Sequence, residues 1–249
     1  MPDVNCRWML EGPAGGAWQM AVDEVLLETA AEQGQATLRF YQWSEPTLSL
    51  GYFQNYAERR KHIASRDCDV VRRQTGGGAI MHDREWTYSL SLPMAHPLAA
   101  DTTDLYHAVH EALCVTLEGW GVPLTVREAS EALPAEQQPF LCFLRRTEGD
   151  VLCEGIKVCG SAQRRRRGAI LQHGSLILAR SPHAPEVPGI GEVSGKKLFH
   201  EPIAERWSLA IADRLRLNLV SGELSELELD ATRTLALEKY TAGNWTTKR

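Results

Sequence analysis

The chain has 249 residues, of which 43% are hydrophobic and 24% are charged, and its formal net charge at pH 7 is -5. This length and composition are typical of a globular protein, and we expect a single domain over residues 1–249. The negative charge argues against a general nucleic-acid binder. No run of about 18 apolar residues occurs, so no membrane span is expected, and the N-terminus lacks the pattern of a secretory signal.

Six cysteines are spread along the chain, and no two of them form a Cys-x-x-Cys pair. A zinc knuckle or a thioredoxin-like motif is therefore not indicated, and we expect no metal site. A chain this long and apolar does not need disulfides to fold. A reducing cytoplasm is the expected location.

The N-terminal part of the chain predicts one long helix followed by short strands. Residues 17–33 carry apolar side chains at helical spacing, which predicts an amphipathic helix, and Gly34 is a natural stop. Residues 36–43 and 47–53 are predicted strands, and Pro46 favours a turn between them.

The middle of the chain continues with strands and a second helix. Residues 69–74 are strand-like and run into a glycine-rich turn, and residues 86–92 alternate apolar and polar side chains, which predicts a half-buried strand. Residues 101–119 begin with Asp-Thr-Thr and continue at helical spacing, which predicts a capped helix. Residues 128–138 are polar and predict an exposed loop.

Three further strand-like segments follow, at residues 139–144, 150–162 and 168–178. Four consecutive arginines, Arg164–Arg167, separate the last two and predict a solvated hairpin tip. Residues 203–241 predict two helices. Strands gather in the middle of the chain without regular alternation with helices, so we expect an α+β fold with a mostly antiparallel central sheet flanked by helices.

The first segment that could bind a ligand or take part in catalysis follows the strand at 69–74. It contains Arg72, Arg73, Gly76, Gly77, Gly78 and His82. Glycines let the backbone approach a ligand closely, and exposed N–H groups can hold an anion or a carbonyl oxygen. No Lys-Ser/Thr follows, so the segment is not a P-loop. On the glycines alone, a tight hairpin turn with solvated arginines is the better interpretation.

The second segment places a lysine, Lys157, inside an otherwise apolar strand that continues as Gly160-Ser161-Ala162. Periodicity favours a lysine that points to solvent. The functional alternative is a partly buried ammonium that stabilises a thiolate or an oxyanion.

Two single residues are further candidate functional residues. Cys142 lies in an apolar segment, where a lone cysteine is usually an inert core residue. His173 precedes a glycine within a strand, and a β-bulge with a hydrogen-bonded histidine is as good an interpretation as a functional role.

The order of these segments resembles the lipoate–protein ligase A/octanoyltransferase superfamily, which also includes biotin protein ligases. The resemblance rests on RRQTGGGAIMHDREWTYSLSLP and GIKVCGSAQRRRRGAILQHGSLIL, and it extends over the chain from about residue 8 to about residue 245. It implies a catalytic domain of the biotin/lipoate protein ligase type.

Within this superfamily the chain resembles the LipM-type octanoyltransferases most. These carry a Cys-Phe pair upstream of the strand lysine, and Cys142-Phe143 stands at the expected place. The segment that begins at His82-Asp83 also resembles the transferases. One departure favours the ligases, because Gly78 stands where LipM-type chains often have arginine. The LipB-type arrangement is absent, since no cysteine follows Cys159.

The resemblance implies a cofactor-free transfer of an octanoyl group from acyl carrier protein, through a thioester on Cys142, to a lysine of a lipoyl-domain or glycine-cleavage H-type protein. Lys157 would favour the thiolate and help deprotonate the incoming amine. Substrate contacts would come from Arg72, Arg73, Gly76, Gly77, Gly78, His82, Gly160, Ser161, Ala162 and His173.

Two alternatives remain open at this point. An ATP-dependent lipoate–protein ligase would need ATP and Mg, and Arg72 and Lys157 would then bind the phosphate of an acyl-adenylate. A non-catalytic protein that retains the scaffold is the other alternative, and it would not acquire an acyl group on Cys142.

Overall fold

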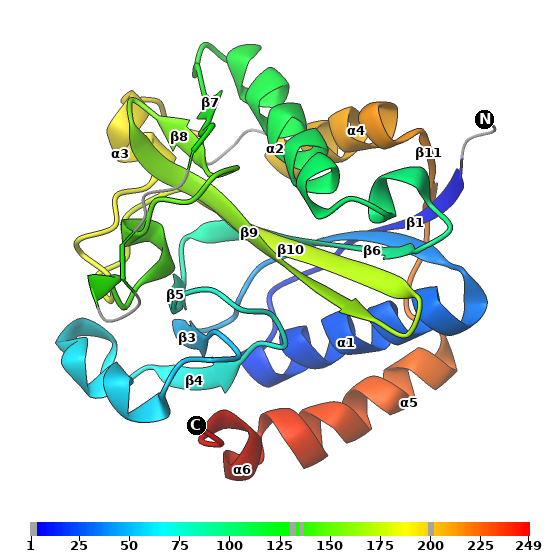
Figure 1. The fold of residues 1–249 in the computed structure, drawn as a ribbon, viewed down its shortest axis with the longest axis horizontal. Helices are drawn as coiled ribbons and strands as arrows, with labels where there is room; N and C mark the ends of the chain where they lie inside the picture. The colour runs from blue at the N-terminus through cyan, green and yellow to red at the C-terminus, as the bar shows by residue number, and fades with distance from the viewer. Residues whose placement is uncertain (1–3, 130–132, 135–136, 199–201) are drawn as a thin grey trace.

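An eight-stranded sheet forms the centre of the protein in the computed structural model (Figure 1). The structure describes residues 4–129, 133–134, 137–198 and 202–249. Across the sheet the strands follow the order β11 (Leu217–Ser221), β1 (Val4–Leu10), β2 (Ala36–Tyr41), β6 (Glu85–Pro93), β10 (Ala169–Ile177), β9 (Ile156–Arg166), β8 (Val151–Cys153) and β7 (Thr125–Val126).

Strand β1 pairs in parallel with β2 and with β11, and the remaining neighbours in this sheet are antiparallel. The α+β class and the mostly antiparallel sheet are thus confirmed. The sequence reasoning assigned no strand to β1 or β11. Both lie at one edge of the sheet and pair with segments far away in the chain, so local patterns indicate them only weakly.

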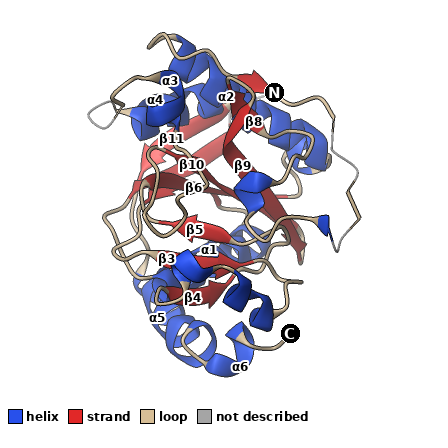
Figure 2. Cartoon of the chain, turned by 90° about the vertical axis from the view of Figure 1, so that its left-hand side faces the viewer, coloured by secondary structure: helices blue, strands red, loops and turns tan. Residues whose placement is uncertain are grey.

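Helices cover both faces of the sheet (Figures 1 and 2). One face carries α1 (Gly16–Gln33), and α5 (Glu226–Leu235) packs outside α1. The other face carries α2 (Thr102–Glu118) and α4 (Ile203–Leu215). The short helices are α3 (Ile190–Ser194), α6 (Gly243–Thr246), the 3-10 turns η1 (Tyr56–Lys61), η2 (Ile63–Ser65), η3 (Pro97–Ala99) and η5 (Cys142–Leu144), and a π-helical turn, η6 (Ala236–Tyr240).

A second, three-stranded sheet lies beside the N-terminal part of α1. Its order is β4 (Asp69–Arg72), β3 (Thr47–Leu50) and β5 (Ile80–His82), with β3 parallel to β4 and antiparallel to β5. Val71 of β4 joins Met20 and Ala21 of α1 in one apolar cluster, together with Tyr41 at the end of β2. The two sheets are therefore joined through the first turns of α1.

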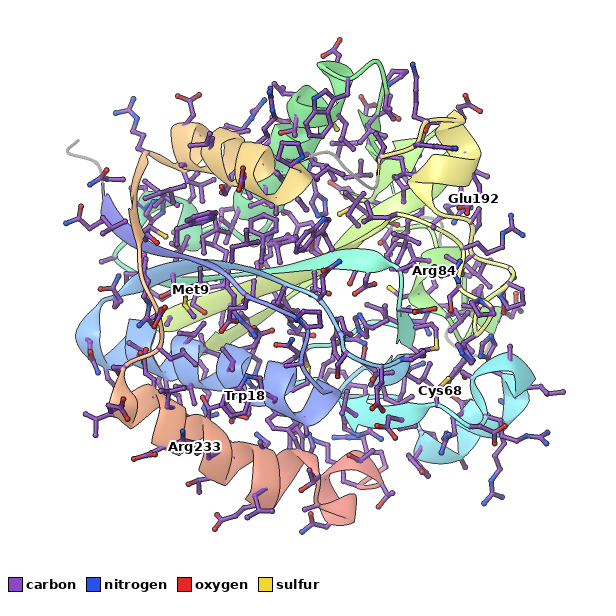
Figure 3. The ribbon with its side chains drawn as sticks, turned by 180° about the vertical axis from the view of Figure 1, so that it is seen from behind. Met9, Trp18, Cys68, Arg84, Glu192 and Arg233 are labelled. Atoms are coloured by element: carbon purple, nitrogen blue, oxygen red, sulfur yellow. The ribbon has the colours of Figure 1, made fainter. Side chains whose placement is uncertain are left out.

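Helix α1 begins and ends close to the predicted residues, and Gly34 closes it in the left-handed conformation with φ 69°. The prediction of an amphipathic helix is wrong, because α1 is buried on most of its sides. Asp23 and Glu24 are buried on it and pair with distant partners. Viewed from behind, Trp18 lies on α1 below Met9 of β1, and both belong to one apolar cluster (Figure 3).

The strand at residues 86–92 is buried on both faces rather than half-buried, because β6 lies between β2 and β10 and under helices on either side. Its polar residues have buried partners: Thr87 accepts a hydrogen bond from the Trp43 ring N–H at 2.9 Å. The predicted helix at 101–119 is confirmed, and the Asp101 carboxylate caps it by accepting from the N–H groups of Thr103 and Asp104.

The predicted strand at 139–144 is wrong. Leu141 makes a single bridge to Ala79, and residues 142–144 then form a 3-10 turn. The predicted arginine tip is also partly wrong, since the turn consists of Arg167 and Gly168 at φ 48° and 90°. Arg164–Arg166 lie within β9, and Arg166 pairs with Glu24 at 2.9 Å.

The predicted exposed loop at 128–138 is exposed at its described residues, while residues 130–132 and 135–136 lie outside the described part of the chain. The two C-terminal helices are confirmed as α4 and α5, with β11 between them. Within the described residues, no helix is long and apolar enough to cross a membrane.

Candidate active site

A pocket with about 420 Å³ of empty space lies where β9 and β10 of the large sheet meet the glycine loop that joins β4 to β5. The residues singled out in the sequence that line it are Arg73, Gly76, Gly77, His82, Cys142, Gly160, Ser161, Ala162 and His173. Tertiary structure thus brings together segments that are about 100 residues apart in the chain.

Cys142 reaches the pocket because its segment pairs with the residue that follows the three glycines. The Ala79 N–H donates to the carbonyl of Phe140 at 2.9 Å, and the Cys142 N–H donates to the carbonyl of Ala79 at 2.7 Å. The chain then turns away in the 3-10 turn η5. This arrangement leaves Cys142 half-buried at the pocket wall next to the glycine loop.

Lys157 lies within reach of this cysteine. Its Nζ donates toward the Cys142 Sγ at 3.8 Å and forms an ion pair with the Asp150 carboxylate at 2.6 Å. Only 2% of the lysine is exposed, so it does not point to solvent as periodicity favours. Burial alone lowers the pKa of Lys157, but the neighbouring Cys142 and Asp150 outweigh it and hold the pKa above its ordinary value.

Gly160 gives the lysine its space. A Cβ at this position would lie 2.5 Å from Cε and 2.8 Å from Nζ of Lys157, which is closer than real Cβ contacts allow. The register of β8 with β9 ends at Cys159. From Gly160 onward, no strand among the described residues pairs with this edge of β9.

Arg73 holds the glycine loop in shape. Its guanidinium donates to the carbonyls of Gly76 at 3.1 Å and Gly78 at 2.9 Å. Burial lowers the pKa of Arg73 to about 10. Gly77 has φ 92°, a conformation that favours glycine, and a Cβ there would lie 3.9 Å from the Cys142 Sγ.

Two predicted pocket residues do not line the pocket. Gly78 is buried, and a Cβ at this position would collide with Arg145 and with the Cys142 backbone, so its role is to let that segment approach. Arg72 is fully buried and donates to the carbonyls of Gly51 at 2.9 Å and Thr246 at 2.8 Å. It joins the C-terminal segment to the small sheet instead of facing a substrate.

The two predicted histidines are both buried in the pocket wall and hydrogen-bonded. His82 stacks on Trp43 with ring centroids 3.9 Å apart, and its Nδ1 lies 2.5 Å from the Glu85 carboxylate. Burial lowers the pKa of His82 although Glu85 opposes this effect, so the ring is neutral near pH 7. His173 contacts the Asp23 carboxylate through Nδ1 at 2.9 Å.

Ser161 is held by groups behind the pocket. Its Oγ lies 2.6 Å from the Tyr88 hydroxyl and 2.6 Å from Nε2 of His110, and Nδ1 of His110 lies 2.5 Å from the carbonyl of Gly149. Burial lowers the pKa of His110 to about 4, so its ring is neutral near pH 7. The serine is thus a fixed part of the wall.

We expect Gly174→Ala to destabilise the protein. A Cβ at residue 174 would lie 2.2 Å from the Ser161 Oγ and 2.5 Å from the carbonyl oxygen of Gly160, neither of which is free to move. Such overpacking costs about 1–3 kcal/mol, which corresponds to a fall of roughly 3–10 °C in the midpoint of thermal unfolding. Gly12→Ala is the matched control, because no atom lies within 4 Å of its Cβ. Equal midpoints for the two variants would contradict this packing.

Sequence reasoning missed part of the wall and one charged partner. The additional lining residues are Met20, Tyr41, Trp43, Ile80, Thr87, Gly174 and Ser175. Asp150 lies beside Lys157 because Glu154 and Gly155, with φ 47° and 78°, form a tight hairpin turn between β8 and β9. The Glu-Gly dipeptide is the signal that could have paired the two ends of this hairpin.

Comparisons with a family model and with individual known proteins point to the same family. The model of the lipoyl protein ligase A/B catalytic domain matches residues 16–184. The chain is similar to the octanoyltransferase LipM of Bacillus anthracis, with 31% identity over 96% of each chain. It is also similar to LipM of Bacillus subtilis and of Moorella thermoacetica, with 31% and 32% identity over 100% of each chain.

Solved structures agree with the fold. Lipoate-protein ligase A bound with ATP superposes with a TM-score of 0.78 over 98% of this chain and 99% of its own, at 20% identity. A bipartite lipoate protein ligase from Thermoplasma acidophilum, solved in a study of that ligase and its E2 lipoyl domain, reaches 0.74 over 98% and 96%, also at 20% identity. At this identity the likeness concerns the fold alone.

Proposed function

This chain belongs to the lipoyl protein ligase A/B catalytic domain family, and we propose that it is an octanoyltransferase of protein lipoylation that works through a thioester on Cys142. The observation that carries this proposal is the contact between the Lys157 ammonium and the sulfur of Cys142, which lines the pocket. A cationic neighbour favours the thiolate form of a cysteine, and Lys157 would supply that charge.

In the first step the Cys142 thiolate attacks the carbonyl carbon of an octanoyl thioester carried by acyl carrier protein. A new bond forms between the sulfur and the acyl carbon, and the bond to the donor sulfur breaks. The departing thiolate takes a proton from Lys157 and leaves as a thiol. Backbone N–H groups at Gly160–Ala162, which line the pocket, would stabilise the oxyanion.

In the second step the amine of an acceptor lysine attacks the acyl group on Cys142. The bond between sulfur and acyl carbon breaks, and the sulfur leaves as a thiolate. The proton lost by the amine returns to Lys157, which restores the original ion pair. The two steps balance without a cofactor, because the thioester supplies the activated acyl group.

The apolar acyl chain would lie in the pocket between the glycine loop and β10. Gly76 and Gly77 would let the backbone approach the acyl chain closely, and Trp43 and Ile80 would supply apolar walls. We propose that residues 1–249 act as one catalytic domain, because both sheets contribute to this pocket. The acceptor is a lipoyl domain or an H-type protein. All six cysteines are free thiols, in keeping with thioester chemistry in the reducing cytoplasm.

Intact-protein mass spectrometry tests the proposal directly. We expect one octanoyl adduct when the protein is mixed with octanoyl carrier protein in the absence of ATP, because the acyl-enzyme is a covalent intermediate. Peptide mapping should locate the adduct on Cys142. Addition of a lipoyl domain should remove the adduct and octanoylate the domain.

The opposite result is equally informative. If octanoylation of the domain required ATP, Mg and free octanoate, and no adduct formed from the thioester, the protein would be a ligase and the thioester mechanism would be rejected. If neither donor yielded product, a non-catalytic scaffold would be indicated.

A further inference from the structure

The Asp150 carboxylate is buried beside the Cys142–Lys157 pair, and only 2% of the residue is exposed. One oxygen, Oδ1, lies 2.6 Å from the Lys157 Nζ, and the other, Oδ2, accepts the N–H of Thr147 at 2.8 Å. Each carboxylate oxygen therefore has a defined partner. The carboxylate thus contacts the ammonium, and the ammonium contacts the sulfur.

The backbone around Asp150 is also fixed. Its N–H donates to the carbonyl of Thr147 at 3.3 Å, and Gly149 between them has φ 84°, so residues 147–150 form a tight turn. The Asp150 carbonyl accepts the Arg127 N–H at 2.8 Å. A carboxylate held this firmly can fix the position of a flexible lysine, because the ion pair offsets the conformational entropy that the lysine side chain loses.

From this geometry we propose that Asp150 is a positioning residue of the transfer reaction, which holds the Lys157 ammonium against the Cys142 sulfur and keeps it in place while it releases and recovers its proton. The inference rests on the proposed function. Asp150 touches neither the thioester nor the acceptor in this proposal, and it acts through Lys157 alone.

Three described titratable groups around the Asp150–Lys157 pair are neutral near pH 7. Burial lowers the pKa of His110, on α2, to about 4. Burial also raises the pKa of Tyr106, on α2, and that of Cys159, on β9, well above their ordinary values. The Asp150 carboxylate is therefore the anion that opposes the effect of burial on Lys157 once Cys142 is acylated and has lost its charge.

We expect Asp150→Asn to slow acyl-enzyme formation by about 10-fold to 100-fold at pH 7.5, since a misplaced proton donor in an active site has effects of this size. The amide keeps the size of the side chain and an oxygen for Thr147, but it removes the charge. Removing an anion lowers the pKa of a neighbouring lysine, so Lys157 loses its proton at a lower pH. The alkaline limb of the pH profile of acylation should therefore move to lower pH.

The measurement is single-turnover acylation from octanoyl carrier protein between pH 6 and pH 10. Asp101→Asn is the matched control, because Asp101 is a helix cap outside the pocket and asparagine caps equally well. A second comparison places Asp150→Asn in a Lys157→Met background. If Asp150 acts through Lys157, the Asp150→Asn substitution should cause no further loss of acylation rate in the Lys157→Met background.

The outcomes separate the two proposals. If the wild-type protein forms no acyl-enzyme, the proposed function fails. If the wild type is acylated and Asp150→Asn keeps its rate and its pH profile, only the role of Asp150 is overturned. Should Asp150→Asn fail to fold, Asp150→Glu retains the carboxylate on a longer side chain. Acylation of the Asp150→Glu variant should be slower, but the alkaline limb of its pH profile should not shift. If the limb moved as far as loss of the charge predicts, the positioning role of Asp150 would be rejected.

Discussion

Replacement of Cys142 by alanine is expected to eliminate the acyl-enzyme and to lower octanoyl transfer from carrier protein by at least about 1,000-fold, because the covalent path needs a nucleophile at this position. No other cysteine lines the described pocket. The change should affect stability by less than about 1 kcal/mol, since the side chain is half-buried and its loss leaves no large cavity. The measurements are intact mass, transfer rate and the midpoint of thermal unfolding.

Cys68→Ala is the matched control for this experiment. Cys68 is also half-buried, but it lies just before β4 and does not line the pocket. Its variant should retain the transfer rate and the adduct on Cys142. Transfer by Cys142→Ala at a rate near that of Cys68→Ala would mean that the acceptor amine attacks the donor thioester directly, without an acyl-enzyme.

Replacement of Lys157 by methionine is expected to lower the transfer rate by about 100-fold or more, because it removes the cation that faces the Cys142 sulfur and the group that we propose to carry the proton. Methionine is similar in length and has no charge. Alkylation of Cys142 by iodoacetamide at pH 7 should slow as well, since the thiolate is the reactive form. An unchanged alkylation rate would contradict the role of Lys157 as partner of the thiolate.

This substitution should also lower stability. Removing one partner of a buried ion pair costs about 3–5 kcal/mol, because the other charge remains buried without compensation. Only 2% of Lys157 and 2% of Asp150 are exposed, so the rule applies here. The double variant Lys157→Met, Asp150→Asn should recover much of the stability, because no unpaired charge remains, while its transfer rate stays low. Recovery of the rate together with the stability would indicate that the single variant was merely misfolded.

The local sequence was sufficient to predict those elements that are specified by interactions among their own residues. Helix α2 has a side-chain cap at Asp101, and α1 stops at a glycine in the left-handed conformation, so both were predictable within one or two residues. The strand pattern in the middle of the chain likewise predicted an α+β fold. The motifs around Gly76–Gly78 and Lys157 indicated the family, which the comparisons show.

Tertiary structure decided what depends on neighbours distant in the chain. The parallel pairing of β1 with β11 joins segments about 210 residues apart, and no local pattern specifies it. Residues 139–144 have the apolar composition of a strand, yet a single bridge to Ala79 and a 3-10 turn leave the cysteine at a pocket wall. Arg72 and Arg73 are adjacent in sequence, but Arg72 donates to the carbonyls of Gly51 and Thr246 and does not line the pocket, whereas Arg73 holds the glycine loop.

The order of residue types along the chain was enough to indicate the fold class, the family and the two side chains that we propose to react. The burial of the lysine and its contacts with the Cys142 sulfur and the Asp150 carboxylate depend on tertiary packing. The physical reason is that a charge enters a protein interior only when partners compensate it. Those partners come from a turn and a hairpin whose relative position is set by packing.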